Sequence, residues 1–383
     1  MGISHCFNTT DFRRIAKRKL PAPVFHYIDG GADDEWSLRR NTEAFNDYEL
    51  LPTHLSDVSS IDIRSTLVGQ SIDWPVMIAP TGASRLVHRD GEPAVARAAG
   101  AFNMPYSLST VGTTTIEDIA AIGEHPKVFQ IYVFKDRGIT RAFVERCKET
   151  RYTALCLTVD TPVAGNRERD NYYGMMATAK PALRSVPSML RHPGWLYRAV
   201  VRKDMELVNI TQVEDAPQFT DMSVKDFIDS QFDRSLTWKD VEWLAGEWDG
   251  PLIIKGVQTV DDCRKAADAG ATAVMLSNHG GRQLEGSPAP VDCVAAVADA
   301  LRDRLEIICD GGIRRGTHIV KALALGANAC SIGRAYLYPL AAGGQSGVER
   351  GLGLLRDEML RSMALIGCDS VDGLDARYVQ RRA

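Results

Sequence analysis

The chain has 383 residues, 45% of them hydrophobic, and is therefore long enough to bury a large core. Its formal net charge of −4 argues against a general nucleic-acid-binding surface, and no apolar run is long enough to cross a membrane. Because the first residues lack the order of a signal peptide and the eight cysteines show no Cys-x-x-Cys pairing, we expect a cytoplasmic protein with buried thiols and no metal site.

Residues 1–70 come before the regular part of the pattern, and we expect them to form helices that cap the bottom or the side of the main domain. Beyond them, eight short β-rich runs recur, most of them separated by amphipathic stretches. The predicted strands are Pro75–Ala79, Tyr106–Ser109, Val128–Tyr132, Ala154–Val159, Leu252–Lys255, Ala273–Ser277, Glu306–Cys309 and Ala329–Ile332. The predicted helices include Glu92–Ala101, Arg141–Thr150, Thr237–Glu247, Val260–Ala269, Val291–Arg302 and Gly316–Leu325.

This alternation of strands and helices predicts right-handed βαβ units and a parallel sheet. Eight units with nearly continuous apolar strands favour a closed (β/α)8 barrel, which we expect to form one domain over residues 1–383. The alternative is an open, doubly wound sheet, which would need a Gly-x-Gly-x-x-Gly turn after its first strand. The chain has no such turn there.

A long insert, over about residues 177–235, separates the fourth predicted strand from the fifth. Its most distinctive part is a basic and aromatic run without acidic residues between Leu183 and Lys203. The run contains Arg184, Arg191, Trp195, Tyr197, Arg198, Arg202 and Lys203. Such a run suits an anionic membrane surface, and the alternative is a lid over the barrel mouth with solvated arginines.

In a (β/α)8 barrel the chemistry belongs at the carboxyl ends of the strands, and here each strand ends in polar residues or glycines. In chain order these are Pro80, Thr81, Gly82, Ser109, Gln130, Tyr132, Thr158, Asp160, Lys255, Ser277, His279, Arg282, Asp310, Gly311, Gly312, Arg314, Gly333 and Arg334. We therefore expect them to surround one site.

The segment Ser277–Arg282 after the sixth strand is the most informative. His279 is a candidate general base, and the planar guanidinium of Arg282 is suited to hold a substrate carboxylate. The alternative is an ordinary histidine in a surface loop.

Glycines after the seventh and eighth strands predict a phosphate site, to which Arg334 would add charge. A phosphate together with a ring of polar residues implies a phosphorylated cofactor across the barrel mouth. Lys255 could neutralise negative charge on that cofactor; the alternative is a surface lysine. No histidine spacing typical of a metal site occurs, and no Gly-x-Ser-x-Gly segment supports a serine hydrolase.

Several motifs in one order extend this interpretation. They are LPAPVFHYIDGGADDE at 20–35, IAPTG at 78–82, FQIYV at 129–133, LTVDTP at 157–162, IIKG at 253–256, SNHGGRQL at 277–284, DGGIRRG at 310–316, ALGA at 324–327 and IGRA at 332–335. With them the chain resembles the FMN-dependent (S)-2-hydroxy acid dehydrogenases and oxidases, over nearly its whole length.

The resemblance implies a role for each position. His279 would be the base, Asp160 its carboxylate partner and Tyr132 the hydrogen-bond partner of the substrate oxygen. The substrate carboxylate would be bound by Arg167, Arg282 and Tyr27, and Lys255 would stabilise the reduced flavin. The FMN ring would contact Pro80, Thr81, Gly82, Ser109, Gln130, Thr158 and Ser277, and its ribityl phosphate Asp310, Gly311, Gly312, Arg314, Gly333 and Arg334.

Departures from the family pattern bear on substrate and acceptor. Val111 stands where glycolate oxidase has tryptophan, and Gly82 is more typical of the dehydrogenases than of the oxidases. LRHPGWLYRAV at 190–200 resembles the insert of the membrane-associated lactate and mandelate dehydrogenases.

The resemblance therefore implies a dehydrogenase for L-lactate that passes electrons to a quinone or to another acceptor other than oxygen. It also implies a location peripheral to the inner face of the cell membrane and assembly as a homotetramer or larger. The alternatives are a mandelate-type dehydrogenase, an oxidase that forms hydrogen peroxide, an FMN-barrel isomerase, and a flavin-binding scaffold without catalysis.

Overall fold

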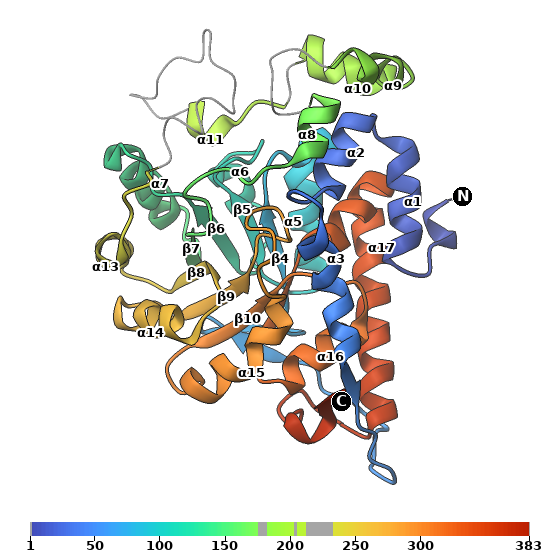
Figure 1. The fold of residues 1–383 in the computed structure, drawn as a ribbon, viewed down its shortest axis with the longest axis vertical. Helices are drawn as coiled ribbons and strands as arrows, with labels where there is room; N and C mark the ends of the chain where they lie inside the picture. Colours follow the sequence, from blue (N-terminus) through green and yellow to red (C-terminus); the bar gives the residue numbers. More distant parts are fainter. Residues whose placement is uncertain (1, 175–181, 203–204, 212–232, 383) are drawn as a thin grey trace.

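The computed structural model describes residues 2–174, 182–202, 205–211 and 233–382. Its centre is a closed barrel of eight parallel strands in which chain neighbours pair and the last strand returns to the first (Figure 1). The strands are β4 Val76–Thr81, β5 Tyr106–Ser109, β6 Lys127–Ile131, β7 Ala154–Thr158, β8 Leu252–Val257, β9 Ala273–Ser277, β10 Glu306–Asp310 and β11 Ala329–Ile332. The predicted barrel is confirmed, each strand end lies within two residues of its prediction, and the open-sheet alternative is wrong.

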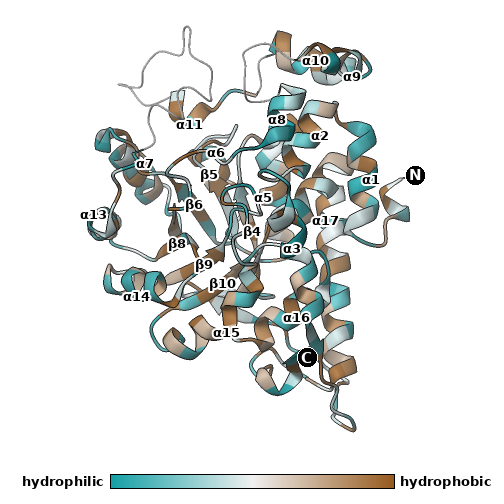
Figure 2. Ribbon diagram, viewed as in Figure 1, coloured by the Kyte–Doolittle hydropathy of each residue, from teal (hydrophilic) through white to brown (hydrophobic). Residues whose placement is uncertain are grey.

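Helices surround the barrel and bury their apolar sides against it, as the predicted amphipathic stretches require (Figure 2). They are α4 Ser84–Val87, α5 Gly91–Ala101, α6 Ile116–Ala120, α7 Arg137–Glu149, α13 Trp238–Trp248, α14 Val260–Asp268, α15 Pro290–Leu301, α16 Gly316–Ala324 and α17 Arg334–Ile366. The helix α7 begins four residues earlier than predicted, because the side chain of Asp136 accepts from Gly138 N and caps it. The long helix α17 is kinked at Gly343 and Gly344.

The side chains that point into the barrel are apolar near the amino ends of the strands and mostly polar near the carboxyl ends. The apolar part near the amino ends is a separate buried cluster that includes Met77, Val128, Cys156, Ile253, Met275 and Ile308. Because side chains alternate along a strand, the inward residues nearer the carboxyl ends are Gln130, Thr158, Lys255, Ser277 and Asp310. All five are buried. The interior therefore gathers most of its polar side chains toward the carboxyl ends of the strands.

The opposite end is closed by a hairpin of β2 Ser65–Leu67 and β3 Gln70–Ile72. Leu67, Val68 and Ile72 belong to the same buried cluster as the inward residues of the barrel. Glu306, at the start of β10, accepts a hydrogen bond from Val68 N at 2.7 Å. The hairpin thus excludes water from the amino end of the barrel.

The N-terminal extension does more than the predicted capping of the bottom or side. It comprises η1 Ile3–His5, α1 Thr9–Lys19, α2 Ala22–Asp29, α3 Trp36–Glu43, η2 Ala44–Asp47 and β1 Tyr48–Leu50; β1 pairs with β12 Val379–Arg381, which follows η5 Ala376–Tyr378. The prediction is wrong for α2, because its last carbonyls accept hydrogen bonds from Arg282 and Arg334 at the carboxyl end of the barrel.

The described parts of the insert are short helices, of which α9 and α10 lie above α2 and α8 in the view of Figure 1. They are η3 Leu183–Ser185, α9 Val186–Leu190, α10 Pro193–Tyr197, the π-helix η4 Arg198–Arg202 and α11 Val208–Thr211; α8 Glu168–Tyr173 comes just before the insert. The rest of the predicted insert, including Lys203, lies outside the described residues. No helix among the described residues is long and apolar enough to span a bilayer. The eight cysteines are free and buried.

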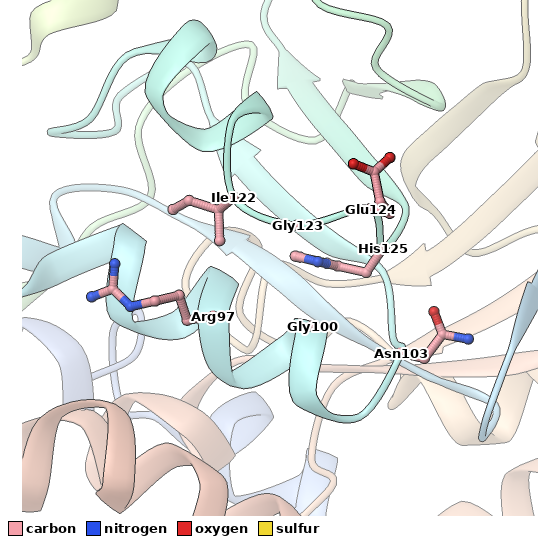
Figure 3. A pocket seen from close by; sticks show the side chains of 7 residues that line it. All are labelled: Arg97, Gly100, Asn103, Ile122, Gly123, Glu124 and His125. Atoms are coloured by element: carbon pink, nitrogen blue, oxygen red, sulfur yellow. The ribbon is translucent and has the colours of Figure 1, made fainter.

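One buried histidine makes the fold sensitive to acid. His125 borders a surface pocket between α5 and the loop before β6, and its ring lies between Gly100 and Gly123 (Figure 3). Neither ring nitrogen has a hydrogen-bond partner among the described residues. Burial, with a smaller contribution from the charge of Lys127, lowers the pKa of His125 to about 4. The folded protein therefore keeps this ring neutral where the unfolded chain protonates it.

We expect the contribution of His125 to stability to be present above its ordinary pKa of 6.5 and to be lost as the pH falls from there toward 4. His125→Leu should therefore reduce the loss of unfolding free energy between about pH 7.5 and about pH 5. Urea unfolding at both pH values measures this difference. The exposed His54→Leu is the control, and an equal pH dependence in wild type and His125→Leu would contradict the prediction.

Candidate active site

The predicted base and its predicted carboxylate partner are in contact. His279 Nδ1 lies 2.9 Å from Asp160 Oδ1, although 119 residues separate them in the chain. With Nδ1–H donating to the carboxylate, Nε2 is the ring nitrogen that remains to accept a proton. Burial lowers the pKa of His279, and the charge of Asp160 opposes this shift. Burial raises the pKa of Asp160, but the charges of His279 and Lys255 outweigh it and keep the pKa below its ordinary value.

Two backbone segments have unusual conformations beside this pair, one next to Asp160 and one at His279 itself. The strand β8 has an irregular register between Lys255 and Val257, where Gly256 has a φ of 105°. A Cβ at Gly256 would lie 2.6 Å from the Cβ of Asp160, so a side chain here would displace the carboxylate. His279 itself has a φ of 58°, which is uncommon for a residue other than glycine. Its backbone N–H donates to Ser277 Oγ at 3.0 Å.

Two arginines converge on the ring of Tyr27. The guanidinium carbons of Arg282 and Arg167 lie 5.0 Å and 5.8 Å from the centre of this ring. Arg282 donates to the carbonyls of Tyr27 and Gly30, and Arg167 forms an ion pair with Asp170. Burial and the nearby charge of Arg167 lower the pKa of Arg282 to about 10. A bound carboxylate would relieve this crowding of positive charge, as the sequence interpretation requires.

Tyr132 lies near this group, and Val111 contacts the loop after β4. Tyr132 is within electrostatic range of Asp160, Tyr27 and Arg167, and burial raises the pKa of its phenol above the ordinary value. Val111 lies against Gly82, because a Cβ on Gly82 would be 2.6 Å from Val111 Cγ2.

Lys255, Ser277 and Asp310 form a buried polar chain inside the barrel. Ser277 Oγ donates to Asp310 Oδ2 at 2.7 Å and accepts from Lys255 Nζ at 3.3 Å. Lys255 Nζ is also 3.7 Å from Asp310 Oδ2. Burial lowers the pKa of Lys255, but the charges of Asp160 and Asp310 outweigh it and raise the pKa. The ammonium group is therefore kept charged at the barrel mouth, and the surface-lysine alternative is wrong.

Buried polar atoms without a partner mark the place for a ring of the predicted cofactor. Gln130 Nε2 and Thr158 Oγ1 are buried and have no hydrogen-bond partner among the described residues. Gln130 Oε1, in contrast, accepts from Ser109 Oγ at 2.8 Å, which fixes the orientation of the amide. Unpaired buried donors are costly, so these atoms fit a polar ligand in the barrel mouth.

The predicted phosphate site has one arginine with unused donors and one that is occupied. Within the part of the chain that the structure describes, the Arg314 side chain makes one hydrogen bond, to the carbonyl of Ile313, and burial lowers its pKa. Arg334 donates to the carbonyls of Ile28, Gly30 and Gly280, and so ties α2 to the loop after β9. Gly311, Gly312 and Gly333 follow β10 and β11 as predicted. These residues fit a phosphate, with Arg314 as the better donor.

The sequence interpretation missed the residues that fix the shape of the Ser277–Arg282 segment. The amides of Asn278 and Asn41 donate to each other, both at 2.7 Å, and Asn278 Oδ1 also accepts from Gly281 N. Asn278 lies inside the motif, but nothing near Asn41 in the sequence signals a partner.

The chain matches the model of the family described as FMN-dependent dehydrogenase over residues 16–381. It is 41% identical to an L-lactate dehydrogenase of Ectopseudomonas mendocina, over 95% of this chain and 96% of that protein. This chain belongs to the FMN-dependent dehydrogenase family.

Solved structures give the same result. The chain is similar to a monotopic membrane protein, (S)-mandelate dehydrogenase, with a TM-score of 0.92 and 34% identity over 99% of this chain and 100% of that chain. A flavocytochrome b2 mutant with bound pyruvate has a TM-score of 0.83 and 32% identity, over 99% of this chain and 88% of that chain. The protein is therefore an FMN-dependent 2-hydroxy acid dehydrogenase.

We expect Arg314→Met to raise the dissociation constant for FMN about tenfold or more, since it removes a charged donor to the phosphate. Fluorescence titration of the apoprotein measures this constant. The matched control is Arg315→Met, because Arg315 is exposed and paired with Glu358. Equal FMN affinity in the two variants would contradict the assignment of Arg314.

Proposed function

We propose that this enzyme oxidises L-lactate to pyruvate, with His279 as the base and Arg282 and Arg167 as the carboxylate-binding pair. The geometry that supports this most directly is His279 hydrogen-bonded to Asp160 beside a tyrosine ring contacted by two arginines. The L-lactate dehydrogenase relative and the pyruvate in the flavocytochrome b2 mutant support the choice of substrate.

The residues divide the reaction between binding and proton transfer. Arg282 and Arg167 bind the carboxylate, and Tyr132 donates to the oxygen that becomes a carbonyl. His279 Nε2 accepts a proton as the alcohol is oxidised, and Asp160 stabilises the imidazolium that results. FMN supplies the acceptor for the two electrons, and Lys255 places a positive charge where negative charge develops.

We also propose that electrons leave the enzyme to a quinone rather than to oxygen. Gly82 supports this, since glycine at this position is more typical of the dehydrogenases of the family. The contact between Gly82 and Val111 also leaves no room for a methyl group at residue 82. The expected homotetramer stays a prediction, which light scattering of the purified protein tests.

The experiment that tests substrate and acceptor together is anaerobic reduction of bound flavin by a panel of 2-hydroxy acids, followed by addition of oxygen or a soluble quinone. We expect L-lactate to bleach the flavin fastest, and quinone to restore its colour faster than oxygen. Faster reduction by mandelate would favour the mandelate-type alternative. Hydrogen peroxide formed at the rate of turnover would favour the oxidase, and no bleaching by any acid would refute the proposal.

Asp160→Asn should lower the rate of flavin reduction about 10²-fold or more while leaving KM nearly unchanged. Because Asp160 raises the pKa of His279, its loss should also move the acid limb of the pH profile to lower pH. Stopped-flow reduction across a pH series measures both effects. The control is Asp292→Asn. The carboxylate of Asp292 accepts hydrogen bonds from Tyr48 and Arg40 and not from His279. An unmoved acid limb would contradict this pairing.

We further propose that α9, α10 and η4 lie on an anionic membrane surface. Their exposed apolar side chains support this. Leu190 is 64% exposed, and Val200 and Val201 are 64% and 63% exposed. Arg191 adds positive charge beside them, and one structural relative is described as a monotopic membrane protein.

Two residues that we expected at the membrane pack on the enzyme instead. Trp195 Nε1 donates to the carbonyl of Leu86 at 2.9 Å, and Arg198 donates to the carbonyl of Arg85 at 3.0 Å. Both acceptor carbonyls belong to α4, so α10 and the start of η4 pack against this helix. The membrane-facing set is therefore smaller and more apolar than the sequence suggests.

Leu190→Glu combined with Val200→Glu should abolish flotation of the protein with anionic lipid vesicles and leave its turnover with a soluble acceptor unchanged. Leu365→Glu is the matched control, because Leu365 lies on α17, outside the insert, and is similarly exposed, at 68%. Unchanged flotation of the double variant, or a wild type that does not float, would count against the membrane surface.

A further inference from the structure

Glu92 is a fully buried carboxylate that joins two loops beside the predicted substrate pocket. It lies in the first turn of α5 and is 0% exposed. Its Oε1 accepts from Ser84 N at 3.0 Å and from Thr113 N at 2.9 Å. Its Oε2 accepts from Thr113 Oγ1 at 2.6 Å and from Thr114 Oγ1 at 3.1 Å. Four hydrogen bonds offset the cost of burying this group, so its position is tightly defined.

The two loops that Glu92 joins also contact each other at the predicted substrate pocket. Ser84 follows β4 by way of Gly82 and Ala83, and Thr113 follows β5 by way of Val111. Ala83 N donates to the carbonyl of Val111 at 2.9 Å. A Cβ on Gly82 would lie 2.6 Å from Val111 Cγ2, so the two loops are in close contact at this point.

Other contacts fix the two ends of the β5 loop but do not join it to the β4 loop. Near its start, Thr110 N and Thr110 Oγ1 both donate to the carbonyl of Gln130. Near its end, Asn209 Nδ2 donates to the carbonyl of Thr114 at 2.9 Å. Between these ends, the hydrogen bonds among the described residues that connect the loop to the β4 side are those of Glu92 and the one from Ala83 N to the carbonyl of Val111.

We propose that Glu92 is a positioning residue that sets the distance between Gly82 and Val111, and through it the width of the pocket for the substrate side chain. This rests on the proposed function, which places these two residues at the pocket. In this proposal Glu92 acts without contacting the substrate. It holds the loop after β4 and the loop after β5 at a fixed distance from each other. A misplaced pocket wall weakens discrimination among acids of different size without removing the base.

Two substitutions separate hydrogen bonding from charge. In Glu92→Gln, the amide oxygen can accept from Ser84 N and Thr113 N, and the amide nitrogen can donate to the threonine hydroxyls. Glu92→Leu has a similar size but leaves both buried N–H groups without a partner. If positioning depends on hydrogen bonds, the first variant should behave like wild type and the second should not.

The kinetic test is steady-state turnover of the FMN-loaded enzyme with a soluble electron acceptor and either L-lactate or (S)-mandelate as substrate. For Glu92→Leu we expect KM for L-lactate to rise about fivefold or more and kcat to stay within about threefold of wild type. The ratio of kcat/KM for the two acids should move closer to 1. Glu92→Gln should keep the preference of wild type. The control is Glu306→Leu, which removes a carboxylate bonded to Val68 N at the other end of the barrel.

An unchanged KM and preference in Glu92→Leu, or the same change in Glu306→Leu, would overturn the proposal. If Glu92→Leu does not fold, Thr113→Val and Thr114→Val remove the two donors to Oε2 separately, and each should give a smaller shift in the same direction. No shift in either variant would also overturn it.

A readout without substrate separates this proposal from the proposed function. Because the β4 loop borders the predicted ring site, Glu92→Leu should shift the visible absorption of bound FMN, and Glu92→Gln should not. If no acid reduces the wild-type flavin, the proposed function fails, yet this shift would still support the positioning role of Glu92. Identical spectra in all variants would count against it.

Discussion

The structure depends first on the closure of eight parallel strands with strict alternation of their side chains. Closure brings the inward residue at each carboxyl end to one place, whatever its distance along the chain. Gln130, Thr158, Lys255, Ser277 and Asp310 share the barrel interior only because each lies an even number of residues from an apolar residue of the buried cluster. A shift of one residue in any strand would turn its polar group outward.

This arrangement concentrates positive charge where water is scarce. Burial lowers the pKa of Arg282, Arg314 and Arg334, whereas the charges of Asp160 and Asp310 are already engaged by His279 and Lys255. These arginines are partly buried and donate to carbonyls, but none forms an ion pair among the described residues, so the fold alone gives no reason to keep three cations together. A phosphate and a carboxylate are the ligands that neutralise such a site. Repulsion among these charges lowers the free energy of unfolding of the ligand-free protein, and binding of anionic ligands, which relieves the repulsion, raises it.

The barrel strands and most candidate site residues could be predicted from the sequence, because their patterns lie within short segments of the chain. Strands such as Ala273–Ser277 are short apolar runs that end in polar residues, so both their extent and the place of His279 follow from pattern alone. Asn41 and Glu92 could not be predicted this way, because their roles depend on partners brought close only by tertiary packing. The same holds for α2, whose carbonyls at the barrel mouth have no sequence signature, and for Trp195, whose indole packs on Leu86.

The helix α8 shows how the insert and the site are joined. Arg167 stands at its start, and Arg169, in its first turn, binds Asp29 of α2 and Glu35 at the start of α3, which anchors α8 to the N-terminal extension. Burial raises the pKa of Asp29, but its hydrogen bonds, led by that from Arg13, outweigh burial and lower the pKa to about 2, so this anchor stays charged across the physiological range.

At the other end of α8, Tyr173 stacks on His26, whose neighbour in the chain is Tyr27. The guanidinium of Arg184, in the described part of the insert, lies 3.7 Å from the ring of Tyr172. Ser188 on α9 also accepts from Ala22 N of α2 at 2.8 Å, so the insert contacts both α2, which carries Tyr27, and α8, whose N-cap residue is Arg167. Arg282, in the loop after β9, donates to the carbonyl of Tyr27 on α2. A displacement of the insert that moved α8 would therefore move Arg167 relative to Arg282. Under the proposed function, such a displacement would alter substrate binding without any change in the barrel itself.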